Sequence, residues 1–146
     1  MADETTTQGI QVQIVTPEGD VYNEQSIEIA TVNTKGGQFG LMRHHEPVLA
    51  ALDINELLVK KDGKTVSLAV NGGFAEFSNN VLTVVADSAE TSDKIDVNRA
   101  QSARDRAETR IQHAQEVHNE DELKRARVAL MRAVNRIHVA AAKQGK

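Results

Sequence analysis

The residues best suited to bind a ligand are arginines in the second half of the chain. They recur at helical spacing in two segments that we expect to pair as antiparallel helices. Such pairing brings arginines of both segments towards one end, where a cluster of guanidinium groups favours a polyanion such as a triphosphate or an acidic protein surface. The alternative is a solvated basic face that Asp105, Glu108 and Glu116 neutralise. The arginines are Arg99, Arg106, Arg110, Arg132 and Arg136.

Other reactive side chains do not form a recognisable catalytic or metal-binding set. His44, His45 and Glu46 are adjacent, so on an extended chain they point to different sides, and no second set of ligands stands at suitable spacing. His113 and His118 lie five positions apart and do not share a helix face. The sequence has no Walker loop, no His-Glu-x-x-His motif and no Gly-x-Ser-x-Gly motif. We therefore expect neither an enzyme nor a metal protein.

The two halves of the chain carry opposite charge. Residues 1–92 contain 5 Lys and Arg against 13 Asp and Glu, and residues 93–146 contain 12 against 8, so net charges of −8 and +4 add to −4. The basic half has no aromatic side chain to stack on bases, and the acidic half would repel phosphates, so we expect no nucleic-acid partner. The chain has no cysteine, which excludes a disulfide framework.

No segment predicts insertion into a membrane. The apolar runs are shorter than the ~18 residues of a membrane-spanning helix, so direct membrane insertion is not expected. Residues 1–9 are polar and acidic, and they lack the basic start and apolar run of a signal peptide. We expect these nine residues to be a disordered leader, and we expect any membrane association to come through a partner.

Apolar residues alternate with period two between residues 10 and 90, which predicts short strands. The pairs Asp62-Gly63 and Asn79-Asn80 are hairpin-turn signals, and Gly72-Gly73 separates two further strands. Many short strands at this spacing imply a sandwich or barrel of antiparallel strands. Aromatic residues make up only 3% of the chain, so the core must rest on Val, Ile, Leu and Ala. Its largest side chains are expected to be Phe39, Phe74 and Phe77.

Two helices follow, each with a narrow apolar stripe composed mostly of alanine. Asn119, with Glu122 three positions later, resembles a capping box that opens the second helix. An alanine methyl buries little area at ~25 cal/mol per Å², so these helices should form readily and pair weakly. Such a hairpin suits a two-state switch, and the alternative is a hairpin that stays in place. The stripes are Ala100, Ala103, Ala107, Ile111, Ala114 and Val117, then Leu123, Ala126, Leu130, Ala133, Ile137 and Ala140.

Three segments of the chain resemble the epsilon subunit of the rotary ATP synthase. The first is GQFGLM at 37–42 followed by HEPVL at 45–49, and the second is AVNGGFAE at 69–76 followed by VLTVVADSAE at 81–90. The third is IDVNRA at 95–100, which is similar to the hexad that opens the first helix in that family. Two departures stand in the first segment: Arg43-His44 replaces a Pro-Gly, and Gln38 stands where several members carry an acid.

The resemblance implies an α+β fold, with an N-terminal antiparallel β-sandwich of about ten strands followed by a C-terminal antiparallel two-helix hairpin. The domains would be the leader at 1–9, the sandwich at 10–90 and the hairpin at 91–146. The implied partners are the gamma subunit, the c-ring, and the alpha and beta catalytic subunits when the hairpin is extended. Gln38 and His45 would contact the c-ring. The implied location is peripheral, on the cytoplasmic face of the cell membrane.

In some members of that family the folded hairpin binds ATP. The resemblance implies that ATP is a regulatory ligand here and that no cofactor is required. By position, the residues around the adenine would be Glu90, Ile95, Asp96 and Ala100. The residues that hold the phosphates would be Arg99, Arg106, Arg132 and Arg136.

We therefore expect a non-catalytic central-stalk subunit that couples gamma to the c-ring. It would inhibit ATP hydrolysis through a mobile hairpin whose folded state ATP stabilises. One alternative is a purely structural rotor coupler with an immobile hairpin and no ATP binding. Another is an independent nucleotide-binding or small-molecule enzyme, which needs a deep pocket with perturbed titratable groups.

Overall fold

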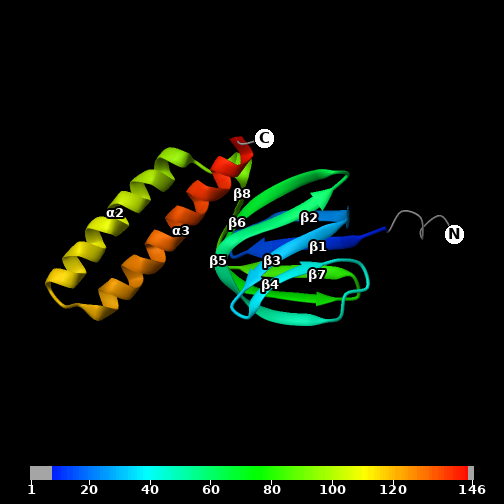
Figure 1. Ribbon diagram of the computed structural model, residues 1–146, viewed down its shortest axis with the longest axis horizontal. Coiled ribbons are helices and arrows are strands. Elements are labelled where there is room, and N and C mark those ends of the chain that lie inside the picture. The colour runs from blue at the N-terminus through cyan, green and yellow to red at the C-terminus, as the bar shows by residue number, and fades with distance from the viewer. Residues whose placement is uncertain (1–7, 145–146) are drawn as a thin grey trace. The chain divides into compact units, whose positions relative to one another are not determined.

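The computed structural model describes residues 8–144, and the side chains of residues 8–142. The chain divides into two compact units, Met1–Thr91 and Ser92–Lys146. Strands make up the first unit and helices the second (Figure 1). Of the leader predicted over 1–9, only Gln8 and Gly9 fall within the described residues.

The first unit is one strongly bent sheet that encloses its own core. The strand order is β2-β1-β7-β6-β5-β3-β4, and β8 pairs with β6. The predicted α+β class, a sandwich followed by a two-helix hairpin, is confirmed. The strands are β1 (Ile10–Thr16), β2 (Gly19–Ile27), β3 (Ile29–Thr34), β4 (Gly37–Leu41), β5 (Val48–Lys61), β6 (Lys64–Ser78), β7 (Val81–Ala86) and β8 (Ala89–Thr91).

The structure contains a parallel strand pair that the sequence did not predict. β1 and β7 run parallel, from the pair Gln11 and Val81 to the pair Val15 and Val85, whereas the other paired strands are antiparallel. A period-two pattern shows that a segment is a strand but carries no information about its neighbour. The intervening strands β2 to β6 form the long connection that parallel pairing requires.

The described residues form eight strands, whereas about ten were expected. β5 joins the segments predicted at 48–53 and 57–60, and β6 joins those predicted at 66–70 and 74–78. Gly72 and Gly73 adopt φ of 90° and 121°, so they bend β6 without ending it. The predicted hairpin turns are confirmed, because Lys61 pairs with Lys64 and Ser78 pairs with Val81 across two-residue loops.

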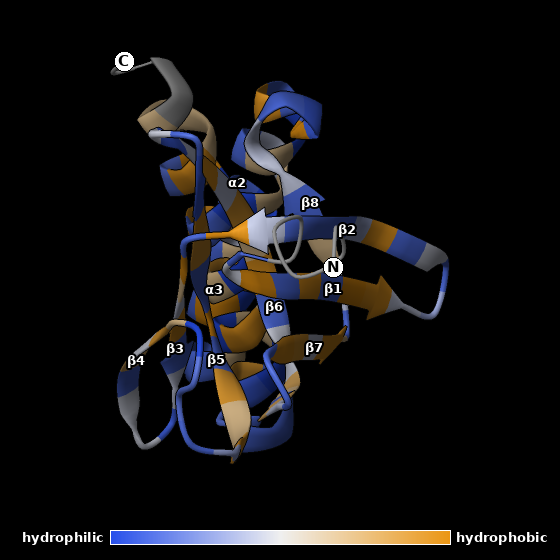
Figure 2. Ribbon diagram, turned by 90° about the vertical axis from the view of Figure 1, so that its right-hand side faces the viewer, coloured by the Kyte–Doolittle hydropathy of each residue, from blue (hydrophilic) through white to orange (hydrophobic). Residues whose placement is uncertain are grey.

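Alternate residues of the strands fill the core of the sandwich. Hydrophobic residues run along β1, β5 and β7 in Figure 2, and the core consists mainly of Val, Ile, Leu and Ala, as predicted. Phe77 is 1% exposed and Phe39 packs partly against the core. The prediction for Phe74 was wrong, because its side chain is 50% exposed. Phe74 stands opposite Val85 on β7, and Val85 also faces outward.

The second unit is a helical hairpin. A short 3-10 helix, η1 (Ser92–Lys94), precedes α2 (Val97–Glu116) and α3 (Glu120–Gln144), which pack side by side and antiparallel (Figure 1). Each helix buries alanines at seven-residue spacing, so these residues lie on one face. We call this set the alanine seam: Ala100, Ala107 and Ala114 in α2, with Ala126, Ala133 and Ala140 in α3.

Side-chain caps and an ion pair define the ends of the helices. The Asp96 carboxylate accepts a hydrogen bond from the Arg99 amide at 3.1 Å and caps α2. Asn119 caps α3 in the same way, because its Oδ1 accepts from the Glu122 amide at 3.1 Å. The predicted capping box is therefore half formed. The Glu122 carboxylate bonds Arg110 instead of turning back to Asn119.

Replacement of Gly73 by alanine is expected to lower the free energy of unfolding of the sandwich by about 2 kcal/mol or more. Its φ of 121° disfavours a side chain, and an added Cβ would collide with the carbonyl oxygen of Val85 on β7. The control is G63A, since Gly63 has φ of 75° and open space around it, so only the backbone cost of about 1 kcal/mol applies. Urea unfolding followed by circular dichroism measures both, and equal losses would contradict the collision.

Candidate functional site

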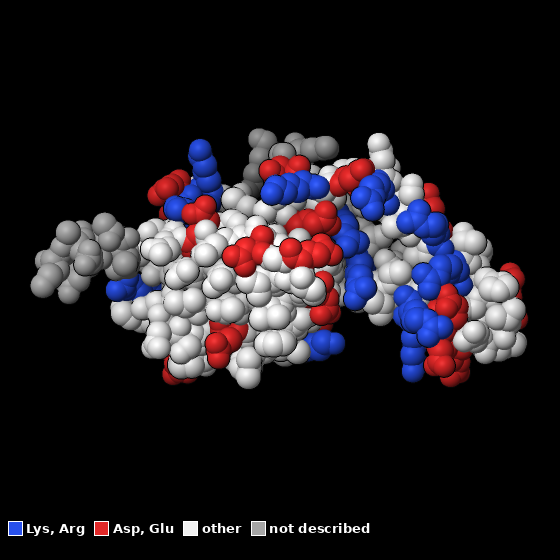
Figure 3. All heavy atoms as spheres, turned by 180° about the vertical axis from the view of Figure 1, so that it is seen from behind, with Lys and Arg blue, Asp and Glu red and all other residues white. Residues whose placement is uncertain are grey.

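The four arginines predicted to hold phosphates lie on both helices of the hairpin. Arg99 and Arg106 are exposed and stand seven positions apart on α2, whereas Arg132 and Arg136 are half-buried at i and i+4 on α3. Because the helices are antiparallel, Arg99 and Arg136 lie in the half of the hairpin away from the turn between α2 and α3, whereas Arg106 and Arg132 lie near the middle of their helices. Lys and Arg gather over the hairpin on the face that Figure 3 shows, and Asp and Glu prevail over the sandwich.

Nearby carboxylates pair with arginines outside this set. Arg104 Nε lies 3.5 Å from Asp105 and 3.8 Å from Glu108, so two of the three acids expected to neutralise the basic face have another partner. Arg110, part of the predicted cluster, pairs with Glu122 at 2.7 Å and so links α2 to α3. None of the salt bridges found among the described residues involves Arg99, Arg106 or Arg132.

Arg132 carries a polar atom that the described residues do not satisfy. Its Nε is buried and has no hydrogen-bond partner among them. A buried donor without an acceptor costs free energy, more so for a charged group, so such an atom calls for an explanation. An anion bound beside α3 would supply the acceptor. The neighbouring Arg136 does interact with other groups of the protein.

The residues predicted to surround adenine have structural roles of their own. Asp96 is the N-cap of α2, with its main-chain oxygen also bonded to the Ala100 amide at 3.0 Å. Ile95 and Ala100 are buried, and Ala100 opens the alanine seam. Glu90 belongs to the first unit, where β8 pairs it with Ala69 of β6. A substitution at Asp96 or Ala100 therefore changes the stability of the hairpin as well as any ligand contact.

Arg106 also borders a hollow that sequence reasoning did not find. An open depression of about 400 Å³ on α2 is lined by Asp105, Arg106, Thr109 and Arg110. The Thr109 hydroxyl bonds the main-chain oxygen of Asp105 one turn earlier, at 3.1 Å. Thr109 lies outside the apolar stripe, and a hydroxyl that bonds to its own helix leaves no pattern in the sequence.

The two residues predicted to contact the c-ring are held by different neighbours. The Gln38 amide, exposed on β4, donates to Asn33 Oδ1 at 3.1 Å. His45 is half-buried, with its ring edge-on to Phe77 at 5.9 Å and its Nδ1 2.7 Å from the Glu46 carbonyl oxygen. The Gln38 side chain is thus exposed and bonded to Asn33, whereas the His45 ring packs on Phe77 of the sandwich. Within residues 8–144 no group of three His, Cys, Asp or Glu could hold a metal ion.

Two arginines act on the Glu122 carboxylate near the turn of the hairpin. Hydrogen bonds from Arg110, and next from Arg125 at 3.1 Å, lower the pKa of Glu122 below the ordinary carboxyl value of 4.5. The network joins α3 both to α2 and to its own next turn. It is exposed, so each pair contributes modestly.

Comparisons with known proteins find the same two parts. Residues 9–92 match the family model described as the beta-sandwich domain of the ATP synthase Delta/Epsilon chain, and residues 93–141 match its long alpha-helix domain. The ATP synthase epsilon chain of Levilactobacillus brevis is 56% identical over 140 residues, which are 96% of this chain and 99% of that one. The epsilon chain of Bacillus pumilus is 44% identical over 90% of this chain and 96% of that one.

A solved structure shares the fold. A chain of the Euglena gracilis mitochondrial ATP synthase, from the cryo-EM structure of its OSCP, F1 and c-ring, superposes with a TM-score of 0.75. It covers 94% of this chain and 82% of that chain, at 20% identity. This likeness extends through both the sandwich and the hairpin.

Acid should weaken the hairpin through Glu122. Because its pKa is lowered in the folded state, its contribution to stability is present above pH 4.5 and is lost as the pH falls through the lowered pKa. We expect E122Q to lower the melting temperature of the helices at pH 7 and to have little effect at pH 3, as measured by circular dichroism. The control E116Q, at an exposed carboxylate of the same hairpin, should show no such difference. An E122Q effect of equal size at both pH values would contradict the prediction.

Proposed function

The chain belongs to the family of ATP synthase epsilon chains, and from this premise we propose that it is a non-catalytic central-stalk subunit of a rotary ATP synthase. In this role the sandwich binds the gamma subunit and the c-ring and turns with both. The observation that carries the proposal is that both halves of the chain match the family, the sandwich over 9–92 and the hairpin over 93–141. The core of the sandwich comes from residues 10–89 alone, as a coupling domain with its own stability requires.

The subunit inhibits ATP hydrolysis by changing the state of its hairpin. In the folded state the hairpin leaves the motor free, and in the extended state its basic side chains meet acidic loops of the alpha and beta subunits and block rotation. The net charge of +4 over 93–146 supports this contact. The alanine seam supports the mobility, because small side chains bury little area and hold the helices weakly.

ATP is the regulatory ligand that stabilises the folded state. The buried Nε of Arg132 supports this, because a phosphate oxygen would satisfy it. Ligand at 100 times its dissociation constant contributes about 2.7 kcal/mol to the state that binds it. That amount is comparable to the small cost of releasing a weakly packed hairpin, so the nucleotide can control which state prevails.

The subunit is peripheral to the membrane, on its cytoplasmic face. Within the described residues no helix combines the length and the apolar character that a membrane crossing requires. Attachment therefore comes through the c-ring, with Gln38 and His45 as the contact residues. Exposure of the Gln38 side chain supports this assignment.

ATP binding is tested by calorimetric titration of the full chain. We expect binding to the unmodified protein and at least tenfold weaker binding to R132A, because the variant loses a charge-assisted contact with phosphate. R127A, an exposed arginine on the same helix, serves as the matched control and should bind normally. The absence of heat with the unmodified chain, under conditions where a known epsilon chain responds, would rule out the ligand.

Two variants at Asp96 separate binding from folding in the same titration. D96A removes the cap of α2 and should destabilise the helix by about 1 kcal/mol whether or not ATP binds. D96N keeps a capping oxygen, so a loss of ATP affinity in D96N with an unchanged melting temperature assigns the carboxylate to the ligand. Unchanged affinity in D96N removes Asp96 from the proposed site.

Inhibition is tested by ending the chain after Ser92 in the assembled ATP synthase. Because the truncated chain retains the whole core of the sandwich, it should still join the complex. We expect ATP hydrolysis by the complex to rise several-fold when the hairpin is absent. Unchanged hydrolysis, with the truncated chain still bound, would leave the structural rotor coupler as the function.

A further inference from the structure

An apolar row crosses the outer face of the sandwich on four neighbouring strands. Phe74 of β6 stands opposite Ala51 of β5 on one side and opposite Val85 of β7 on the other. Val85 in turn pairs with Val15 of β1. Val15 is half-buried and the other three residues are exposed. We call these four residues the Phe74 row. Because cross-strand neighbours touch on one face of a sheet, they form a continuous apolar surface.

Acidic side chains border the Phe74 row. Two positions along a strand return to the same face, which places Asp53 beside the row on β5 and Glu76 beside it on β6. Asp87 directly follows the end of β7. All three acids are exposed, and none of the salt bridges found among the described residues includes them. The row is therefore an apolar surface with a negative border.

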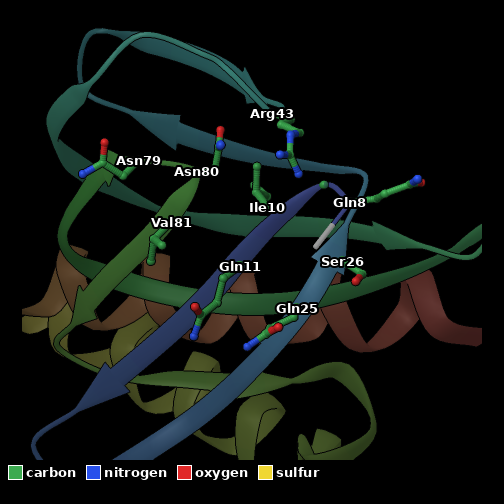
Figure 4. A pocket seen from close by; sticks show the side chains of 10 residues that line it. Gln8, Ile10, Gln11, Gln25, Ser26, Arg43, Asn79, Asn80 and Val81 are labelled. Atoms are coloured by element: carbon green, nitrogen blue, oxygen red, sulfur yellow. The ribbon is translucent and has the colours of Figure 1, made fainter. Parts of the chain in front are cut away.

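The Phe74 row shares no residue with the polar pocket that Figure 4 shows. That pocket has a volume of about 260 Å³, and several of its polar side chains are engaged within the protein. Asn80 Oδ1 accepts the His44 amide at 2.7 Å, and Ser26 and Arg43 also interact with other groups of the protein. A ligand in the pocket would compete with these contacts, whereas the exposed side chains of the row are accessible as they stand.

A complementary surface lies on α3. Val128, Met131 and Val134 are exposed and follow one another at three-residue intervals, so they share one side of the helix. Lys124 stands four positions before Val128, and Arg127 four positions before Met131, so both cations border this side. Both are exposed, and neither takes part in the salt bridges found among the described residues. We call the three apolar residues the Met131 face.

The two surfaces match in spacing and in charge. Three residues of a helix rise about 4.5 Å along its axis, and neighbouring strands of a sheet lie about 4.7–4.9 Å apart. A helix laid across the strands can therefore set successive residues of the Met131 face against successive strands of the Phe74 row. The cations of α3 then approach the acids that border the row, and this complementarity favours one orientation of the contact.

We propose that the Met131 face of one copy of the chain docks on the Phe74 row of a second copy. A second copy supplies both the apolar side chains and the positive charges that the row requires. The net charges of −8 over 1–92 and +4 over 93–146 attract in the same sense. The contact joins two different surfaces, so two such contacts can close a dimer. It concerns the free chain, and so goes beyond the proposed function.

The first experiment is sedimentation equilibrium of the full chain without nucleotide, from about 1 μM to about 1 mM. We expect the average mass to rise with concentration, because a small contact gives weak association. The rise should be smaller at high ionic strength, since salt screens the attraction between the charged borders. A mass that stays at that of a single chain across the whole range would overturn the proposal.

One variant on each surface identifies the contact. F74E and M131E each place a carboxylate in an apolar patch that becomes buried on docking, so each should self-associate at least tenfold more weakly. M42E is the matched control, because Met42 is exposed to much the same degree as Met131, 55% against 51%, and belongs to neither surface. M42E should associate like the unmodified chain. Equal losses in all three variants would contradict the assigned surfaces.

A mixture of F74E and M131E tests the pairing itself. M131E retains an intact Phe74 row and F74E an intact Met131 face, so the two should form a one-to-one complex that neither forms alone. This recovery also shows that both variants are folded. Absence of the mixed complex would overturn the proposal. So would a loss of association in only one of the two variants, because that result would indicate that like surfaces pair.

The gamma subunit is the other candidate occupant of the Phe74 row. If F74E fails to join the assembled ATP synthase and the unmodified free chain never self-associates, the row belongs to gamma and the proposal is overturned. If the unmodified chain self-associates and F74E fails to assemble, gamma and a second copy compete for the row. Normal assembly of F74E would leave the second copy as the occupant. The proposed function stands in each case, because it rests on the family match.

Discussion

The contact between alanine methyl groups of α2 and α3 determines how firmly the hairpin holds together. Alanines seven positions apart give each helix a narrow face of small side chains, which allows close approach but removes little apolar area from water. The helices themselves form readily, because Ala, Arg, Glu and Gln favour helix. Modest further contributions come from the Asp96 and Asn119 caps and from the Arg110–Glu122 pair that links the helices near the turn.

The hairpin and the sandwich differ in how they are held. The sandwich has a continuous core of larger aliphatic side chains around Phe77. Its long strands β5 and β6 pair from Val48 with Phe77 to Lys61 with Lys64. The buried side chains of the hairpin are mostly alanines, with Ile95 and Val139 as the larger ones, and its ion pairs are exposed. The proposed change of state therefore involves the hairpin, whereas the sandwich keeps its core in both states.

Sequence reasoning worked where the signal is local. Periods of two and of 3.6 identified strands and helices, and Asp62-Gly63 and Asn79-Asn80 marked their turns. It failed where the outcome depends on remote neighbours. Phe74 stands in an alternating apolar pattern like a core residue, yet its side chain faces outward beside Val85. The Glu122 carboxylate pairs with Arg110 of the other helix instead of bonding the Asn119 backbone.

The parallel pairing of β1 with β7 governs the order in which the chain can assemble. Gln11 pairs with Val81, which comes 70 positions later in the chain (81 − 11). During synthesis β1 therefore leaves the ribosome long before β7 has been made. Until then β1 has only β2 beside it, and the other edge of β1 stays open to other chains. The helices of the hairpin can form as soon as they are synthesised, because their contacts join residues close in the sequence and form quickly. The folding step most exposed to aggregation thus belongs to the sandwich and not to the hairpin.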